Sequence, residues 1–384
     1  MRQERFNRWA GVSVGVISSA LLVGCGSGRQ EETIDPAKAY IDAKTVLLQS
    51  ADDTDPGTRS HAIEALATAL GAEAGATFTQ ALEDENPAVR FAAALAIGDT
   101  EHKPALPALL KMAQTKTGER DKRVFCGVIY ALYRLGNDEH ARDLGKLLFD
   151  DEREVRMDAA LAMGRMGEPS AMGPLKTLLA NEQDDGVRIQ VTESLSLLGD
   201  SRCAEVIEAY TKGYFLDLRL AAIPALGRAG GTRAPRALKQ LTQDRHPSRV
   251  RVSAGGELAR LGHFDQDAYD LCVASVKDPA KVLEEASKRS KRAADKDAAS
   301  LKRLAILSLG WMGRQDVVSL LHPLLKSKDG GVRVAGALSM LRLLKAYRPA
   351  PASPKEPASR PAAKSPETRP AKEKPKLHTA PAKG

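Results

Sequence analysis

Apolar residues recur along this chain with the 3.6-residue period of amphipathic helices. In one segment Val155, Ala159, Ala162 and Met166 lie on one broad face, and Gly167 follows where a helix end needs a left-handed residue. A second stretch with an apolar face begins seven residues later. The pattern predicts pairs of helices joined by short turns.

The helix pair recurs as a repeat of about 31 residues. Each copy has a turn with an acidic residue, proline or glycine, then Val-Arg or a variant of it, then a run rich in Ala and Leu. The arginine-equivalent positions are 59, 90, 125, 156, 188, 219, 251, 302 and 333, with spacings of 31, 35, 31, 32, 31, 32, 51 and 31. The glycines expected to end the first helices stand eleven residues later, at Gly167, Gly199, Gly230, Gly262 and Gly313. About nine such units predict an all-α solenoid, which we expect to be a curved rod roughly 70–90 Å long.

The row of repeat arginines has a structural interpretation. Helices stacked at roughly 8–10 Å bring successive arginines into a ladder, and a half-buried arginine needs an acidic partner. The acids expected to pair with the ladder lie in the turns, at Asp84, Asp151, Asp185, Asp217, Asp244 and Asp329. Residues 35–49 form one more amphipathic helix, which we expect to cap the first repeat.

Together these features resemble the short HEAT-like repeats first associated with bilin lyases and widespread in bacterial scaffolds. The resemblance rests on the 31-residue period, the Val-Arg pair and the terminal glycine, and it covers roughly residues 35–344. The Thr-Pro-Leu-His of ankyrin repeats and the Trp/Tyr/Pro signature of tetratricopeptide repeats are absent. The resemblance implies a right-handed α-solenoid with a concave face suited to binding.

The composition agrees with a helical core built from small side chains. Hydrophobic residues make up 43% of the chain but aromatic residues only 4%, and Ala and Leu both favour helices. Cys126, Cys203 and Cys272 fall within the apolar pattern and form no CxxC pair. We therefore expect buried, unpaired thiols rather than a zinc site.

Residues 1–24 are typical of a bacterial lipoprotein signal peptide. A cationic start, residues 1–8, precedes an apolar run, residues 9–23, that is shorter than the roughly 20 residues of a bilayer-spanning helix. The run leads into Leu-Val-Gly-Cys25, which resembles the lipobox and implies cleavage before Cys25, lipidation of its thiol and acylation of the new N-terminus. We therefore expect a protein exported to the bacterial cell envelope and anchored in a membrane by lipid, with residues 25–34 as a flexible tether. An uncleaved anchor helix, or an ordinary signal with an incidental cysteine, is the alternative.

The net charge of +8 is concentrated at the chain ends. Residues 345–384 contain ten Lys or Arg, three Glu and nine prolines, and such a segment cannot form a core. We predict a disordered basic tail that contacts an anionic envelope polymer or lipid headgroups, or serves as a spacer. Export argues against specific nucleic-acid binding, as does the presence of a single aromatic residue, Tyr347, among its charges.

The spacing of 51 residues locates an insertion near residues 281–300. Glutamates four residues before Lys288 and Arg289 predict that it is helical. Lys288, Arg289, Lys291 and Arg292 make it a candidate binding site, and a solvated helical extension without a partner is the alternative.

Recognisable catalytic motifs are missing from the sequence. It has no G-x-S-x-G, P-loop, H-E-x-x-H or Rossmann fingerprint, and Glu101-His102 reverses the His-Glu order of HEAT-like iron hydroxylases. We expect no catalytic residue, metal or cofactor, and predict that the chain is not an enzyme. The favoured hypothesis is a scaffold that binds an unknown protein partner on its concave face, with Tyr214 and Phe215 as candidate contacts. The alternatives are an enzyme or enzyme subunit of the bilin-lyase or hydroxylase kind, and an envelope polyanion binder that uses the tail.

Overall fold

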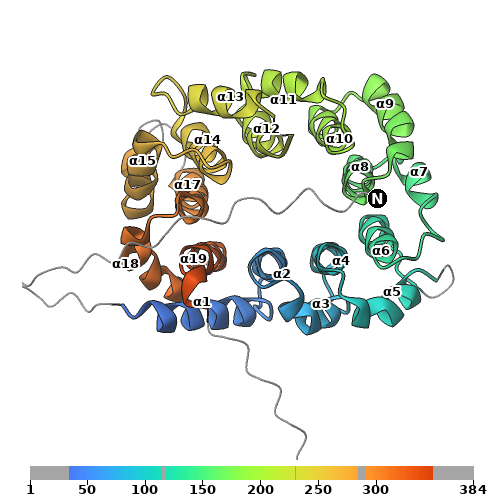
Figure 1. Ribbon diagram of the computed structural model, residues 1–384, viewed down its shortest axis with the longest axis horizontal. Helices are drawn as coiled ribbons and strands as arrows, with labels where there is room; N and C mark the ends of the chain where they lie inside the picture. Colours follow the sequence, from blue (N-terminus) through green and yellow to red (C-terminus); the bar gives the residue numbers. More distant parts are fainter. Residues whose placement is uncertain (1–33, 115–117, 230, 284–290, 349–384) are drawn as a thin grey trace, which may run out of the picture.

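The helices of this chain form two concentric layers (Figure 1). The computed structural model describes residues 34–114, 118–229, 231–283 and 291–348, and within these residues there is no strand. The inner layer consists of α2 (Pro56–Ala69), α4 (Pro87–Thr100), α6 (Lys122–Arg134), α8 (Arg153–Met166), α10 (Asp185–Leu197), α12 (Leu216–Ala229), α14 (Ser248–Arg260), α17 (Lys291–Met312) and α19 (Gly330–Leu343). The outer layer consists of α1 (Pro36–Ser50), α3 (Gly75–Ala81), α5 (Leu106–Met112), α7 (Asp143–Leu147), α9 (Met172–Asn181), α11 (Cys203–Thr211), α13 (Arg233–Leu241), α15 (Gln266–Lys277) and α18 (Val318–Leu321). The predicted all-α solenoid of two-helix repeats is confirmed.

The solenoid closes into a ring (Figure 1). Each inner helix packs against the next inner helix along the chain, and the last of them, α19, packs against the first, α2. Arg333 of α19 forms an ion pair with Asp53, which lies just before α2. The expectation of an open, curved rod was therefore wrong, because a steady curvature over these units brings the two ends together.

Both ends of the chain build the ninth unit of this ring. The outer helix over α19 is α1, which also contacts α2. Ala43 and Leu47 of α1 belong to the same apolar core as Leu338 and Leu341 of α19, and all four are buried. The helix expected to cap the first repeat thus has a partner, supplied by the C-terminal end of the described chain.

Side chains and glycines set the helix ends much as the sequence indicates. Asp55 accepts a hydrogen bond of 2.7 Å from the Thr58 amide at the start of α2, where Pro56 occupies the first turn. Left-handed backbone conformations occur at the predicted Gly167, Gly199, Gly262 and Gly313, and also at Gly231. The predicted Gly230 lies outside the described residues.

Inner helices approach one another closely where glycine faces serine. A Cβ on Gly310 of α17 would lie 2.7 Å from Oγ of Ser339 on α19, and one on Gly164 of α8 would lie 2.7 Å from the Ser194 side chain on α10. The Ser339 hydroxyl donates a hydrogen bond of 2.8 Å to the carbonyl of Ile306 on α17. Such close contacts shorten the inner circumference relative to the outer one, which favours the curvature that closes the ring.

The arginine ladder is present and follows the ring. Arg59 pairs with the predicted Asp84 at 2.8 Å, and Arg251 pairs with the predicted Asp244. Arg90 instead pairs with Glu119 at 2.7 Å.

The next arginines of the ladder along the chain, Arg156 and Arg188, also have partners other than those predicted. Arg156 pairs with Glu182 at 2.7 Å, and Arg188 donates to the hydroxyl of Tyr210 at 3.0 Å. The predicted partners Asp151, Asp185, Asp217 and Asp329 form no ion pair with a ladder arginine among the described residues. Most partners lie in the turn of the following repeat, so the ladder links neighbouring repeats.

Candidate functional site

The exposed aromatic pair Tyr214 and Phe215 lies in the turn between α11 and α12. The residues are 94% and 65% exposed, and their rings meet edge to face with centroids 5.6 Å apart. The sequence left open whether these residues belong to the core. The structure places them in solvent at an edge of the ring, not on its concave face.

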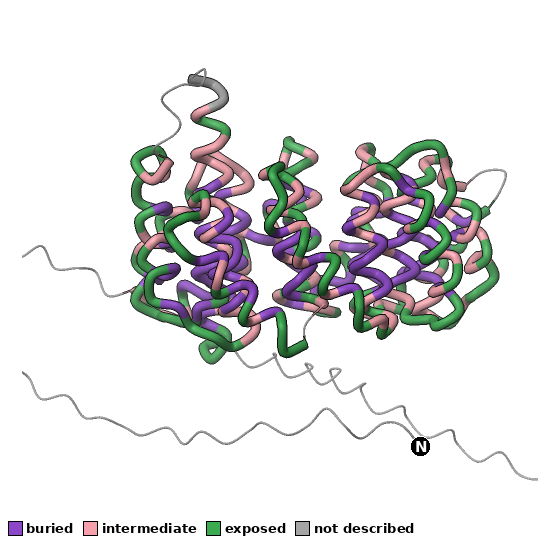
Figure 2. The backbone as a smooth tube through the Cα atoms, turned by 90° about the horizontal axis from the view of Figure 1, so that it is seen from above, coloured by how far each residue is buried: buried purple, intermediate pink, exposed green. Residues whose placement is uncertain are grey.

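The basic insertion lengthens one inner helix. Helix α17 has 22 residues, and its first turns project beyond the neighbouring helices at one edge of the ring (Figure 2). Lys291 and Arg292 begin this helix. Lys288, Arg289 and the expected lipidation site Cys25 lie outside the described residues.

A second row of side chains follows the inner helices, nine residues after each ladder position. Its members are Thr68, Asp99, Arg134, Arg165, Leu197, Arg228, Arg260, Trp311 and Arg342. Five of the nine are arginines, a recurrence that is visible in the sequence but that our sequence analysis missed. Because Arg165 of α8 pairs at 3.0 Å with Asp99 of α4, two inner helices away, this row points into the ring.

Two separate groups of hydrogen-bonded and charged side chains lie on α4, α6 and α8. Asp99 accepts a hydrogen bond of 2.6 Å from the Tyr130 hydroxyl in addition to its ion pair with Arg165. Arg123 of α6 pairs at 2.7 Å with Asp158 of α8. Burial raises the pKa of Asp158, and the charge and hydrogen bond of Arg123 only partly offset this. The first group links α4, α6 and α8, and the second links α6 to α8.

Glu64 of α2 faces the same interior. Its side chain is accessible to solvent, but the protein around it partly desolvates the carboxylate and raises its pKa, and the nearby charges of His61 and Arg165 partly offset the rise. Arg165 extends from α8 to Asp99 on α4, the helix next to α2, so its charge acts on Glu64 from within the ring. A water-accessible carboxyl with a raised pKa beside a histidine is a common feature of acid–base sites.

The opposite part of the lining holds a second group of charges. Arg228 of α12 pairs with the buried Glu193 of α10, with Nη2 and Oε2 3.1 Å apart. Arg260 and Glu257, both on α14, pair at 2.7 Å. Arg342 of α19 lies over the ring of Trp311.

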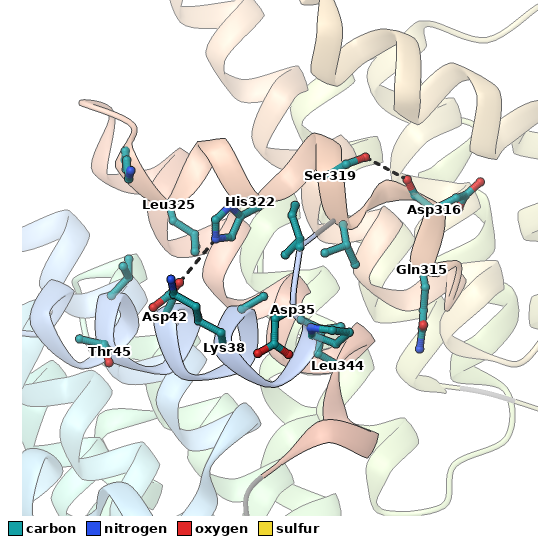
Figure 3. Close-up of a pocket in the computed structure, with 16 residues that line it drawn as sticks. Asp35, Lys38, Asp42, Thr45, Gln315, Asp316, Ser319, His322, Leu325 and Leu344 are labelled. Carbon is teal, nitrogen blue, oxygen red and sulfur yellow. Dashed lines mark hydrogen bonds and ion pairs between the residues drawn. The ribbon is translucent and has the colours of Figure 1, made fainter. Parts of the chain in front are cut away.

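A cleft of about 1630 Å³ runs along the seam where the chain ends meet (Figure 3). Its walls come from α1 and from the segment that contains α18 and the 3-10 turns Gln315–Val317 and His322–Lys326. His322 lies 3.6 Å from the Asp42 carboxylate across the cleft. Both walls mix apolar with charged side chains, so the cleft has no dominant charge.

The three cysteines that the sequence analysis singled out have structural roles. Cys126, Cys203 and Cys272 are buried and free, as predicted, and burial raises their thiol pKa values. Among the described residues no group of His, Cys, Asp and Glu could hold a metal. No helix in the same part of the chain is long and apolar enough to cross a membrane.

Comparisons with known proteins agree with the repeat architecture. Residues 45–127 and 117–196 match the family of HEAT repeats, and no curated protein matches the sequence. Among solved structures, the chain is similar to the complex of CpcE and CpcF of phycocyanin lyase from Nostoc sp. PCC7120, at 19% identity and a TM-score of 0.39, over 66% of this chain and 97% of that one. It is also similar to human deoxyhypusine hydroxylase in complex with glycerol, at 17% identity and a TM-score of 0.34, over 80% and 99% of the two chains. An engineered protein is similar at 16% identity and a TM-score of 0.27, over 79% and 98%.

These comparisons correct the prediction that the chain is not an enzyme. Two of the similar structures are of a phycocyanin lyase and a deoxyhypusine hydroxylase. The absence of familiar catalytic motifs from the sequence gave no ground for excluding an enzymatic role.

Proposed function

We propose that this chain, a HEAT-repeat protein, binds a protein partner at the ring edge that contains Tyr214 and Phe215. The supporting observation is the exposure of this pair, 94% for Tyr214 and 65% for Phe215. Aromatic side chains are enriched among the residues that dominate binding energy, and covering two of them removes a large apolar area from water.

The position of the pair suits a contact with another protein. The rings of Tyr214 and Phe215 meet edge to face, and this contact reduces the side-chain freedom that would be lost on binding. They lie in a turn, and turns on a rigid scaffold commonly provide binding residues. The binding surface proposed here is therefore the edge of the ring rather than a concave groove.

The test is a comparison of three full-length proteins in an affinity pull-down from detergent-solubilised envelope, followed by a binding titration. We expect the double substitution Tyr214→Ala and Phe215→Ala to weaken partner binding at least about tenfold, as hot-spot truncations do. Phe149→Ala is the matched control, because Phe149 is 50% exposed in the corresponding turn before α8. Equal binding by the double variant and the wild type would remove this edge as the partner site.

We further propose that Cys25 anchors the protein to a membrane of the cell envelope. The support is the sequence around Cys25, and two or more acyl chains would hold the protein stably. Intact-mass spectrometry should find a lipidated N-terminal cysteine, and Cys25→Ser should move the protein to the soluble fraction. Retention on an anionic envelope polymer that depends on residues 345–384 would assign a polyanion-binding role to the tail.

An enzyme, or a subunit of one, of the bilin-lyase or hydroxylase kind is the second candidate. The raised pKa of Glu64, beside His61 and within the ring, supports it. Bound metal or a coloured cofactor in the purified protein, lost together with activity in Glu64→Gln, would favour this role. A colourless protein without metal whose partner affinity is unchanged in Glu64→Gln would count against it.

A further inference from the structure

The arginines of the second row are neutralised, with one exception. Arg165 pairs with Asp99. Arg134 pairs with Glu101, Arg228 pairs with Glu193, and Arg260 pairs with Glu257. Among the described residues, Arg342 forms no ion pair with a carboxylate, unlike the other four arginines of the row. Of the five arginines at this repeated position, Arg342 is thus the one without a carboxylate partner among the described residues.

Arg342 is held in place although it lacks an acceptor. Its guanidinium centre lies 4.0 Å from the ring centroid of Trp311, and its Nε atom is buried without a hydrogen-bond partner. Burial lowers the pKa of Arg342 to about 10, and only the charge of Glu257 opposes that shift. An unpaired buried cation costs free energy, and in native proteins such a group commonly indicates an acceptor from outside the chain.

The surroundings of Arg342 are net positive and partly apolar. Glu257 is the acid whose charge acts on it, and Glu257 is already hydrogen-bonded to Arg260 at 2.7 Å and within reach of the charge of Arg228. Trp311 is 38% exposed, and Leu307, one turn earlier on the same face of α17, is half-buried. An incoming anion would meet an unused guanidinium beside an apolar wall.

We propose that Arg342 and Trp311 form a binding site for an oxyanion, a carboxylate or phosphate group of a ligand that enters the ring. The terminal N–H groups of the planar guanidinium, which are not among the buried atoms without a partner, donate to two oxygens of the group, as arginine does when it binds carboxylates and phosphates. Trp311 keeps the guanidinium plane in place by stacking, and its exposed edge contacts the body of the ligand. This site is separate from the Tyr214–Phe215 edge and does not depend on it.

Trp311 provides a direct probe of the site. The chain has two tryptophans, and Trp9 lies outside the described residues, so Trp9→Phe in the full-length chain leaves Trp311 as the sole tryptophan. Its fluorescence and the thermal midpoint are followed while inorganic phosphate or acetate replaces chloride at constant ionic strength and pH 7. We expect a saturable fluorescence change and a rise in the midpoint with phosphate, acetate or both, and none with chloride. Phosphate alone indicates a phosphate ligand, and acetate alone a carboxylate.

Two arginine substitutions in the Trp9→Phe chain separate this site from general charge effects. Arg342→Met should raise the apparent Kd at least about tenfold, while its thermal midpoint in chloride is no lower, since an unpaired buried charge has been removed. Arg236→Met, an exposed arginine on outer helix α13, should respond like the parent. The proposal is overturned if the parent shows no saturable change with either oxyanion, or if phosphate and acetate raise the midpoint of Arg342→Met as much as that of the parent.

Discussion

At the residue scale, the stability of the ring depends on buried charge pairs between turns. Arg156 donates to Glu182 at 2.7 Å and to the carbonyls of Asp150 and Asp151 at 2.9 and 3.0 Å. Glu182 also accepts from the amides of Gln183 and Asp184, each at 2.9 Å. Burial raises the pKa of Glu182, but these hydrogen bonds outweigh it, and the pKa lies below its ordinary value.

Removing one partner of this pair should cost far more than removing a surface pair beside it. Arg156→Met leaves the Glu182 carboxylate buried and lowers the free energy of unfolding by about 3–5 kcal/mol. Arg153→Met is the matched control, because Arg153 is well exposed in its pairs with Glu154 and Asp184, and it should cost about 0–1 kcal/mol. Urea unfolding of both variants at pH 7 gives the comparison. Equal losses would show that the ladder pair is not buried in solution.

The same pair predicts a pH dependence. The folded-state pKa of Glu182 is lowered, so its contribution is fully present above the unfolded pKa of about 4.3 and is lost as the pH falls through the folded value. The difference in unfolding free energy between wild type and Arg156→Met should therefore shrink as the pH falls from 7 towards 3. A difference that stays constant over this range would mean that the carboxylate charge does not contribute to it.

At the element scale, the sequence predicts the helices better than it predicts their contacts. The 31-residue period and the left-handed glycines such as Gly167 follow from local patterns, and local patterns depend on few residues. The partner of Arg90 is Glu119, which was not among the expected turn acids, because pairing depends on how neighbouring repeats are stacked. The second row could have been found as a recurrence of arginine, but its inward direction depends on closure of the ring.

Replacing a glycine at the contacts between inner helices should lower the free energy of unfolding for steric reasons. Gly310→Ala places a Cβ 2.7 Å from Oγ of the fully buried Ser339, and such overpacking costs about 1–3 kcal/mol. Gly173→Ala is the control, since Gly173 of α9 is exposed with nothing within 4 Å of an added Cβ, and it should stabilise the helix by about 0.5–1 kcal/mol. Chemical unfolding measures both effects. A Gly310→Ala protein as stable as wild type would show that α17 and α19 are further apart than the structure places them.

At the scale of the whole molecule, closure of the ring brings α1 and α19, from opposite ends of the described chain, together as one more two-helix repeat. A solenoid normally needs caps because its terminal repeats expose an apolar face. Here α1 covers α19, and Arg333 extends the ladder to Asp53 at the start of the chain's first repeat. The sequence did contain a sign of this, a single N-terminal helix without a first partner. The closure itself was not predictable, because a small error in the angle between repeats accumulates over the ring.

Gly330 tests closure directly because it meets the other end of the chain. A Cβ on Gly330, the first residue of α19, would lie 2.0 Å from Oγ1 of Thr58, which is itself 3% exposed on α2. In a closed ring Gly330→Leu must force α19 away from α2, which lowers the free energy of unfolding by about 1–3 kcal/mol and increases the radius of gyration measured by small-angle X-ray scattering. In an open solenoid the same leucine would lie in water at a helix start and be slightly stabilising, since leucine is a better helix former than glycine by about 1 kcal/mol. Gly173→Leu, at an exposed position where an added Cβ has nothing within 4 Å, gives the reference for that gain, so a Gly330→Leu protein that matches it in stability and size would show that the ring is open in solution.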